Sequence, residues 1–327
     1  MATQAKTSTA PIQVTEENFR QAESDLYFQN SIKLGGAGKF HHIRGAMPID
    51  NQTVIRANRD TLYSSALFDL DAGPVTITLP DPGGRFMSLQ VFDEEQYSAE
   101  TVYAPGSFTY TKEKIGTRYF LVGIRTFVDP NDPKDVENAH ALQDAIKVEQ
   151  HGGPGAFDFP NWDAASQKTI RDELLERASK IPDTNRMYGP RGTVDPERHL
   201  IGTATGWGAN APKDATYIPV VPPKNDGETV YRLTVKSNVP VDGFWSISVY
   251  GADGYFHKND QDSYSINNVT AKKDADGSVT IQFGGCDGTA PNCIPITKGW
   301  NYWVRLYRPR KDILDGAWKF PEAQPIS

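Results

Sequence analysis

The sequence has few of the features that define several large classes of protein. Only two of its 327 residues are cysteines, and no apolar run approaches the roughly 20 residues that a membrane-spanning helix requires. Lysine and arginine number 34 against 41 aspartates and glutamates, so the net charge is −7, and no basic block is present. We therefore expect no nucleic-acid partner, no membrane span and no docking on anionic membrane surfaces.

Motifs of several enzyme classes are also missing. The glycines cluster in turns and never take the spacing of a phosphate-binding or dinucleotide-binding loop, so no redox cofactor is expected. Ser64 and Ser65 are candidate nucleophiles, but no Gly-x-Ser-x-Gly elbow surrounds them. No metal is expected either, because adjacent strand residues such as His41 and His42 point to opposite faces.

The composition that remains is that of an ordinary globular protein. Hydrophobic residues make up 38% of the chain and charged residues 23%. A chain of 327 residues is long enough for two domains or for one large β-rich unit.

The two cysteines flank a short loop rich in glycine, proline and asparagine. Cys286 and Cys293 are separated by Asp287-Gly288-Thr289-Ala290-Pro291-Asn292. Two cysteines this close, with no others in the chain, are typical of a disulfide that closes a loop in an oxidising compartment. The alternative is a pair of free thiols in a cytosolic protein. Two cysteines alone do not fill a zinc site.

Apolar and polar residues alternate, as in strands, along two stretches of the chain. In the segment between these stretches, apolar residues recur at the spacing of a helix. Short strands with turn signals run from Gln52 to Phe127 and again in the last third of the chain, which predicts antiparallel sheets or sandwiches. The predicted strands include residues 75–79, 85–92, 118–127, 230–236, 244–250, 279–283 and 302–307.

Three segments have the pattern of helices. Residues 15–28 are expected to begin at a Thr15 cap and to bury Phe19, Ala22 and Leu26. Asp132-Pro133 starts a second helix, and the third is expected from about Asp163 to Lys180. Residues 182–228, rich in proline, glycine and asparagine, are interpreted as a long connection or surface loop.

The densest group of chemically useful side chains is Asn58-Arg59-Asp60-Thr61-Leu62-Tyr63. In a strand, Asn58 and Asp60 would face one way, and Arg59 and Tyr63 the other, so one pocket could take all four only if the chain bends between them. Asp60 is the best candidate for a general acid or base. The alternative is a buried structural network in which Asp60 caps amides or pairs with an arginine.

Other candidates lie outside this motif. His42, with Arg44 nearby, could form an acid–base pair with a carboxylate, although a packed or exposed histidine is the plainer interpretation. Aromatic walls suit a flat ligand and an arginine suits an anion, but alternating aromatics are also ordinary sandwich core. An arginine inside an aromatic strand needs a partner if it is buried. The second group of candidate ligand-binding residues is Trp245, Tyr250, Tyr264 and Arg305.

Several motifs resemble two protein families of unknown function. Asn58–Ser64, Phe68–Pro74 and Gly84–Phe86 look like DUF1254, and Phe244–Tyr250, Asp262–Ser265 and Trp303–Tyr307 look like its usual partner, DUF1214. The resemblance extends from about residue 15 to residue 325. Ser263 stands where many relatives carry an arginine, so any role of that guanidinium is not carried over to this chain.

The resemblance implies an α+β, predominantly β fold with two antiparallel, sandwich- or jelly-roll-like domains and an inserted helical segment. The corresponding domain ranges are a flexible N-terminus (1–14), a DUF1254-like domain (15–148), a helical and loop connection (149–228) and a DUF1214-like domain (229–327). Members are often exported bacterial proteins. We therefore expect a periplasmic or secreted protein whose signal peptide has been removed, with a cytoplasmic location as the alternative.

The leading functional hypothesis is an enzyme, of hydrolase or lyase type, that acts on a small polar or anionic organic compound between the domains. Asp60 would be the acid or base, Arg59 and Arg305 would hold anionic groups, and Tyr63 and His42 would support them. The alternative is a non-catalytic ligand-binding or structural protein of the cell envelope. A homo-oligomer is compatible with either hypothesis.

Overall fold

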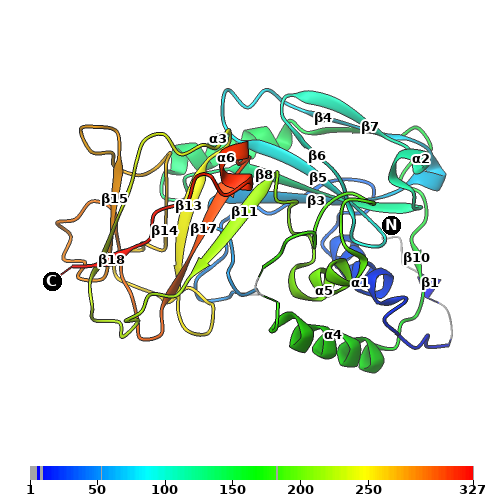
Figure 1. Ribbon diagram of the computed structural model, residues 1–327. Coiled ribbons are helices and arrows are strands. Elements are labelled where there is room, and N and C mark those ends of the chain that lie inside the picture. Colours follow the sequence, from blue (N-terminus) through cyan, green and yellow to red (C-terminus); the bar gives the residue numbers. More distant parts are fainter. Residues whose placement is uncertain (1–5, 8–9, 53, 182, 327) are drawn as a thin grey trace. The chain divides into compact units, whose positions relative to one another are not determined.

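The computed structural model describes residues 6–7, 10–52, 54–181 and 183–326 (Figure 1). Part of the N-terminal segment predicted to be flexible, residues 1–5 and 8–9, lies outside the described residues. The chain forms two compact units. Unit 1 comprises Met1–Arg44, Tyr63–Thr126 and Glu137–Ala211, and unit 2 comprises Gly45–Leu62, Phe127–Val136 and Pro212–Ser327.

These units are interleaved along the chain, whereas the ranges predicted from the sequence were continuous. Residues 45–62 and 127–136 group with the C-terminal segment, although both lie within the range 15–148. The division falls between Leu62 and Tyr63, inside the motif that the sequence singles out. The candidate residues therefore belong to both units, and each set is described within its own unit.

Unit 1 contains a sandwich of two sheets. A five-stranded sheet in the order β2-β3-β8-β5-β6 faces a three-stranded sheet in the order β7-β4-β9. The alternation that the sequence shows at Val75–Leu79 places Val75, Ile77 and Leu79 in the core between the sheets. The strands are β2 (His41–His42), β3 (Thr61–Asp69), β4 (Val75–Leu79), β5 (Met87–Asp93), β6 (Ser98–Tyr103), β7 (Gly106–Tyr110), β8 (Tyr119–Phe127) and β9 (Lys147–Glu149).

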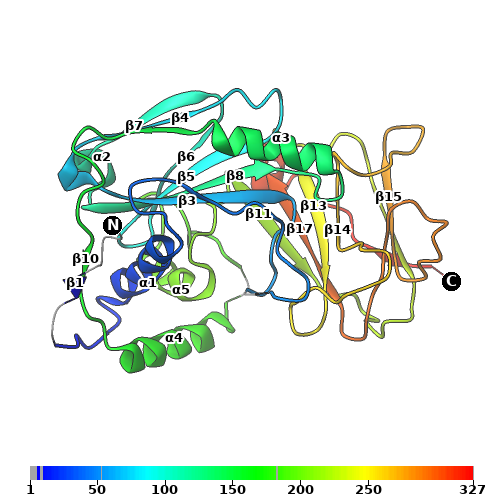
Figure 2. The ribbon, with the colours of Figure 1, turned by 180° about the vertical axis from the view of Figure 1, so that it is seen from behind.

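Helices cover the other face of the five-stranded sheet of unit 1, as Figure 2 shows. Phe28 of α1 packs with Leu67 of β3 and Phe92 of β5. A separate apolar cluster joins α1, α4 and α5. The remaining elements before residue 211 are α1 (Phe19–Lys33), α2 (Lys112–Ile115), α3 (Pro133–Asp144), α4 (Ala164–Ala178), α5 (Pro196–Gly206), the 3₁₀ turn Leu70–Ala72 and the short parallel pair β1 (Lys6–Thr7) and β10 (Asp158–Phe159).

The first predicted helix needs correction. It begins at Phe19 after Asn18 rather than at a Thr15 cap, and it continues to Lys33 before the glycine run. Leu26, predicted to be buried, is 39% exposed. The reason is that the helix packs against different partners along its length, with Phe19 and Ala22 on α4 and α5 and Phe28 on the sheet. No single apolar stripe therefore describes its buried side.

Residues 182–228 were predicted to be a long connection, and this was wrong for two segments. Helix α5 occupies Pro196–Gly206, and strand β11 occupies Ala215–Val220. Asp195 caps the helix by accepting from the amides of Glu197 and Arg198, and Pro196 takes the first helical position. The helix-start signal, Asp195 followed by Pro196, was present in the sequence, but it was missed because turn-forming residues surround it.

Unit 2 contains a second sandwich, built from four-stranded sheets in the orders β11-β17-β13-β14 and β16-β15-β12-β18. Aromatic and aliphatic side chains from both sheets, including Tyr231, Phe283, Trp300 and Tyr302, fill its core. Its further elements are β12 (Tyr231–Val235), β13 (Trp245–Tyr250), β14 (Ser265–Asn267), β15 (Val279–Phe283), β16 (Cys293–Ile294), β17 (Asn301–Tyr307), α6 (Lys311–Leu314) and β18 (Gln324–Pro325).

The predicted fold class is confirmed. The fold is α+β and predominantly β, with mostly antiparallel sheets, and four of the six helices among the described residues (α2 to α5) lie between residues 112 and 206. The predicted helices at Asp132-Pro133 and after Asp163 are present as α3 and α4, and Asp163 caps α4. None of the described helices has the length and apolar composition that crossing a bilayer requires.

Candidate functional site

The motif at residues 58–63 bends just before strand β3. The side-chain oxygen of Asn58 accepts from the amide of Asp60 at 2.9 Å, and its side-chain nitrogen donates to the Thr61 hydroxyl at 3.0 Å. Such a local bond to the backbone two residues ahead holds a turn. The bend that the residue order suggested is therefore present, and Asn58 makes it.

Asp60 is buried in unit 2 and is 1% exposed. One of its carboxyl oxygens accepts from the side chain of Asn267 at 3.1 Å. Within the described residues, the other oxygen has no hydrogen-bond partner. Burial raises the pKa of Asp60, and the nearby Arg305, Ser246, Asn267 and Arg59 oppose that rise only in part. The protonated form is therefore favoured compared with an aspartate in water.

Arg305 is also buried, and neutral groups hold it. Its guanidinium donates to the Ser248 hydroxyl at 2.8 Å, to the Tyr250 hydroxyl at 2.6 Å and to the Arg56 carbonyl at 2.8 Å. Burial lowers its pKa, but Tyr250, Tyr307 and Asp60 outweigh that effect and hold the pKa of Arg305 above its usual range. The arginine stays charged and ties residues 56–57 to the sheet.

Strand alternation explains this arrangement. In β13, Trp245, Ile247 and Val249 point into the sandwich core, so the hydroxyls of Ser248 and Tyr250 lie on the opposite face. Arg305 of β17 lies on that same outer face, across the ladder from β13. Trp245, proposed as a ligand-binding residue, is 3% exposed and packs against Phe320 in the core.

Arg59 takes a different direction from Asp60. Its guanidinium donates to the Met47 carbonyl and stacks over the ring of Tyr264, 5.3 Å from the ring centroid. Both side chains line a pocket of about 400 Å³ in unit 2. Burial lowers the pKa of Arg59, while Tyr264, Asp262 and Asp60 oppose that shift. The half-buried guanidinium therefore lies at a wall of a polar pocket.

The pocket is built from four segments of unit 2. Its lining comprises Arg59, Asp129, Pro130, Asn131, Gln261, Asp262, Ser263, Tyr264, Ser265, Ile266, Thr270, Lys272, Cys286, Gly288, Ala290, Pro291, Asn292 and Cys293. Charged side chains of both signs are present, so the site can meet an anionic group together with hydroxyl or amino groups.

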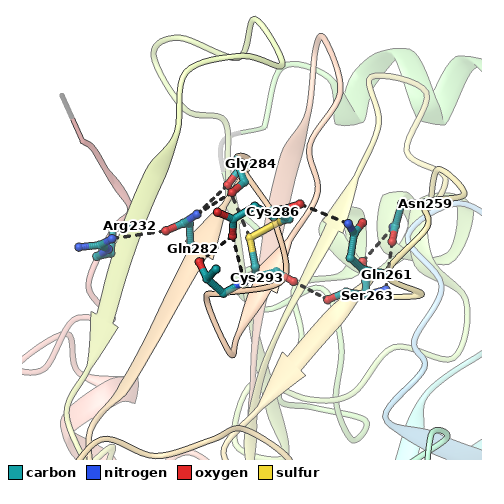
Figure 3. The surroundings of a disulfide bond; sticks show 11 residues. Arg232, Asn259, Gln261, Ser263, Gln282, Gly284, Cys286 and Cys293 are labelled. Atoms are coloured by element: carbon teal, nitrogen blue, oxygen red, sulfur yellow. Dashed lines mark hydrogen bonds between the residues drawn. A yellow bond between two sulfur atoms is a disulfide. The ribbon is translucent and has the colours of Figure 1, made fainter.

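The predicted disulfide is confirmed and belongs to this pocket. Cys286 and Cys293 are bonded, and the described residues contain no free cysteine. Figure 3 shows the bond beside the segment that carries Gln261 and Ser263. Ser263 donates to the Cys293 carbonyl at 2.7 Å, and Gln261 donates to the Cys286 carbonyl at 3.2 Å.

His42, Arg44 and Tyr63 lie in unit 1, where they form a network with α3. His42 Nδ1 lies 2.7 Å from the Ser64 hydroxyl, and Gln143 donates to the same hydroxyl at 3.2 Å. Burial and Arg44 lower the pKa of His42, which favours the neutral ring. However, Ser64 is only 1% exposed, so its hydroxyl is closed to a substrate in this conformation.

Arg44 and Tyr63 complete this network. Arg44 forms an ion pair with Asp144 and donates to the Gln143 side chain at 3.3 Å. The Tyr63 carbonyl accepts from Gln143 at 3.2 Å, and Arg125 lies over the Tyr63 ring. The network joins β2, β3 and α3.

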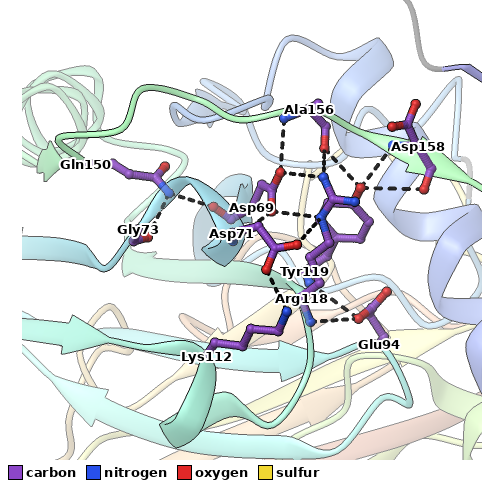
Figure 4. Close-up of polar contacts among 10 residues, drawn as sticks. All are labelled: Asp69, Asp71, Gly73, Glu94, Lys112, Arg118, Tyr119, Gln150, Ala156 and Asp158. Carbon is purple, nitrogen blue, oxygen red and sulfur yellow. Dashed lines mark hydrogen bonds and ion pairs between the residues drawn. The ribbon is translucent and has the colours of Figure 1, made fainter.

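A further polar cluster in unit 1 was missed by the sequence analysis. Arg118 donates to both carboxyl oxygens of Asp69, at 3.0 and 2.8 Å, and to the Ala156 carbonyl at 2.9 Å (Figure 4). Its neighbour Asp71 accepts from Lys112 at 2.6 Å. Asp69 is part of the family motif at Phe68–Pro74, but nothing in the sequence near it identifies Arg118 as its partner.

The structure thus divides the candidate residues into separate groups. Arg59 and Tyr264 share the pocket, whereas Asp60, Tyr250 and Arg305 belong to the buried polar network of unit 2. Asn58 shapes the turn between these two groups. Among the residues that the structure describes, no group of three or more histidine, cysteine, aspartate or glutamate side chains is placed to hold a metal ion.

Comparisons with known proteins bear on the fold and the family. The model described as Protein of unknown function (DUF1254) matches residues 37–113, and that described as Protein of unknown function (DUF1214) matches residues 223–311. No curated protein matches the chain.

Two solved structures share the fold over most of their length. The VPA0106 protein from Vibrio parahaemolyticus aligns over 95% of this chain and 97% of its own, with a TM-score of 0.73 and 18% identity. An uncharacterized protein from Burkholderia cenocepacia aligns over 95% and 88%, with a TM-score of 0.50 and 10% identity. Both motif sets and both family models agree, so the chain belongs to the proteins that carry a DUF1254 region followed by a DUF1214 region.

Proposed function

We propose that the protein binds a small organic anion in the pocket of unit 2, with Arg59 as the charged contact. The observation that carries this proposal is the state of the Arg59 guanidinium. It is half-buried at the pocket wall, and none of the described carboxylates forms an ion pair with it. Asp262 and Asp60 act on it only from a distance, so a partly desolvated guanidinium that has no ion-paired carboxylate gains a strong, bidentate partner when a carboxylate or phosphate binds.

The other pocket residues suit a compact, polar ligand. The volume of about 400 Å³ lies within the range of small-molecule sites, which is roughly 300–1,000 Å³. Tyr264 offers a ring face and Lys272 a second cation, while Asp129 and Asp262 can accept from hydroxyl or amino groups. A hydroxylated or amino-substituted carboxylate matches this set.

The test is binding of a panel of anions, namely succinate, citrate, benzoate and inorganic phosphate, followed by calorimetry and by NMR of the protein amides. We expect at least one carboxylate to bind and the Arg59→Gln substitution to weaken it about tenfold or more, as expected for loss of a charge-assisted pair.

Arg310→Gln provides the matched control, because Arg310 is exposed, pairs with Asp242 and does not line the pocket. It makes the same change of charge and should leave affinity unchanged. Equal binding by the Arg59→Gln variant and the wild type would overturn the proposed role of Arg59.

A second candidate function is catalysis of hydrolysis or elimination on such a compound, with Asp60 as the acid. It is favoured by the raised pKa of Asp60 and by its carboxyl oxygen that accepts no hydrogen bond within the described residues. Because Asp60 is 1% exposed and does not line the pocket, this function also requires a conformational change that brings the compound to the carboxyl group. Asp60→Asn tests it once a turnover is found. Loss of turnover with retained stability supports catalysis, and unchanged turnover eliminates it.

We also propose that this is an exported bacterial protein, because its disulfide suits an oxidising compartment. Thiol titration of the unreduced protein under denaturing conditions, after purification from its native cells, should find no free thiol. Two free thiols would contradict export.

A further inference from the structure

The geometry of the pocket wall points to regulation of the same site, and we propose that the anion pocket is complete only while Cys286 and Cys293 are joined. This inference rests on the proposed function. It concerns how the pocket is assembled, and its test is separable from the identity of the ligand.

The disulfide loop supplies a whole wall of the pocket. Cys286, Gly288, Ala290, Pro291, Asn292 and Cys293 all line it. Both cysteines are therefore part of the pocket surface. The bond between them fixes the distance between the two ends of the loop that forms this wall.

The two ends of the wall are attached to unit 2 in different ways. Asn292 is buried, accepts from the Lys272 amide at 2.9 Å and donates to the carbonyls of Lys272 and Thr280 at 2.8 and 3.0 Å. These three bonds fix Asn292 and the backbone of Lys272 independently of the disulfide. This end should keep its position after reduction.

The tip of the loop has no comparable attachment. Thr289 donates from its amide and hydroxyl to Asp287, at 2.9 and 2.6 Å, so these bonds stay inside the loop. In the described chain, Gly288, Ala290 and Pro291 make no hydrogen bond to other elements. The tip is therefore held through Cys286, by its disulfide and by the bond from Gln261 to its carbonyl.

The backbone leading into the loop is held as far as Gly285, because the Gly284 amide donates to the Ile294 carbonyl at 2.9 Å and the Gln282 side chain donates to the carbonyls of Gly284 and Gly285 at 3.1 and 3.2 Å. The freedom gained when the bond is opened therefore begins at residue 286 and includes Gly288. Gly284, Gly285 and Gly288 have φ values of 79°, 60° and 86°, a region that glycine enters without steric cost. Glycine also has the most conformations to regain when a constraint is lost. Opening the loop should therefore disperse the positions of residues 286–291, and the pocket should lose this wall.

The chemical step is ordinary thiol–disulfide exchange with a dithiol reductant. One thiolate of the dithiol attacks a cysteine sulfur, the Cys–Cys bond breaks, and the other cysteine leaves as a thiolate. The second thiolate of the dithiol then attacks the dithiol sulfur of the mixed disulfide and releases the first cysteine as a thiolate. The dithiol is oxidised to a cyclic disulfide. The two cysteine sulfurs receive two electrons and two protons and become thiols.

The experiment compares oxidised protein with protein reduced by dithiothreitol. Hydrogen exchange followed by mass spectrometry needs no ligand. We expect exchange at residues 286–291 to become at least tenfold faster on reduction, while the amide of Lys272 keeps its protection. Unchanged exchange across 286–291 would overturn the proposal.

Binding of succinate, citrate, benzoate and phosphate is measured in the same two states. We expect the dissociation constant of any bound anion to rise at least tenfold on reduction. The Cys286→Ser/Cys293→Ser double variant should bind like the reduced protein and should not respond to dithiothreitol, which shows that the reductant acts through this bond.

The outcomes separate the two proposals. Absence of binding by the oxidised protein across the panel counts against the proposed function. Binding with equal affinity in the oxidised, reduced and double-variant forms overturns the redox dependence alone. Circular dichroism of the reduced protein and of the double variant checks that unit 2 remains folded.

Discussion

Arg118 in unit 1 and Arg59 in unit 2 show two uses of an arginine at the border of a β-sandwich. Arg118 donates hydrogen bonds to both carboxyl oxygens of Asp69 and to a backbone carbonyl, so its N–H groups are used in contacts within the protein. Arg59 has a carbonyl and an aromatic ring as its contacts, and it lines a pocket. A cation already paired with a carboxylate stabilises the fold, and one without such a partner can receive a ligand.

Arg305 is a third case. It is 3% exposed, and the groups that accept its hydrogen bonds are hydroxyls and carbonyls rather than a carboxylate. The carboxyl group of Asp60 is close enough to influence its pKa, but no ion pair is formed within 4.0 Å in the described residues. The contrast between charged groups that have an ion-pair partner and those that do not therefore applies to buried carboxyl groups as well.

The largest effect is expected for Asp25, a buried carboxyl group of unit 1 for which the described part of the chain supplies no cationic partner. One oxygen accepts from Trp162 at 2.8 Å, and burial raises the pKa of Asp25 to about 7. The folded state binds the proton of Asp25 more tightly than the unfolded state does. The contribution of Asp25 to the free energy of unfolding is therefore fully present below about pH 4 and is lost as the pH rises to about 7, a decrease of about 4 kcal/mol in all. Urea unfolding across this range measures the slope.

Asp25→Asn should flatten that slope, since an amide does not titrate. Asp172→Asn, at an exposed position on α4, is the matched control and should keep it. A slope that is equally steep in wild type and the Asp25→Asn variant would show that Asp25 is not the group responsible.

Arg305→Met should destabilise the protein by about 3 kcal/mol, because it removes the donor from buried hydroxyl and carbonyl groups and takes the cation away from Asp60. Chemical denaturation measures the loss. Arg310→Met, on an exposed side chain, should change stability by less than about 0.5 kcal/mol. A similar small effect at Arg305 would refute the structural role assigned to it.

Asp69→Asn should cost about 2 kcal/mol, because an amide can accept through only one of the two oxygens that now meet Arg118. Burial alone would raise the pKa of Asp69, but bonds from Arg118, Ala156 and Asp71 outweigh it and lower the pKa. The stability from Asp69 is therefore present above about pH 4 and is lost as the pH falls below that value. The same acid-side loss in the Asp69→Asn variant would contradict this assignment.

The smallest effect on stability is expected at Arg59. Arg59→Gln should change the free energy of unfolding by less than about 1 kcal/mol, because the guanidinium makes no carboxylate pair within the described residues. Thermal unfolding with and without succinate or citrate measures both properties. A large loss of stability without ligand would place Arg59 among the structural arginines and end the contrast with Arg118.

Much of the fold could be predicted because its cause is local. Alternation at Val75–Leu79 and Val279–Phe283 gives strands, and Asp163 and Pro133 mark helix starts. The disulfide was predictable for the same reason, since its cysteines lie only seven positions apart in the sequence. The failures are of two kinds. Leu26 was misplaced because neighbouring elements decide which face of α1 is covered, and helix α5 and strand β11 were missed because turn-forming residues surround them.

The candidate site was only partly predictable. The sequence identified Arg59, Asp60, Tyr264 and Arg305 as chemically important, but it could not divide them into pocket and network. That division depends on Asn267 and Tyr264, which lie some 200 residues further along the chain and contact Asp60 and Arg59 respectively.

The sequence by itself therefore determined several main strands of both sandwiches, such as Val75–Leu79 and Val279–Phe283, the closed cysteine loop and the family. Only the tertiary structure decided that Asp60 turns inward and Arg59 turns toward the pocket. The physical reason is that the bend made by Asn58 is local, whereas burial of a carboxyl group and desolvation of a guanidinium depend on what distant strands place beside them.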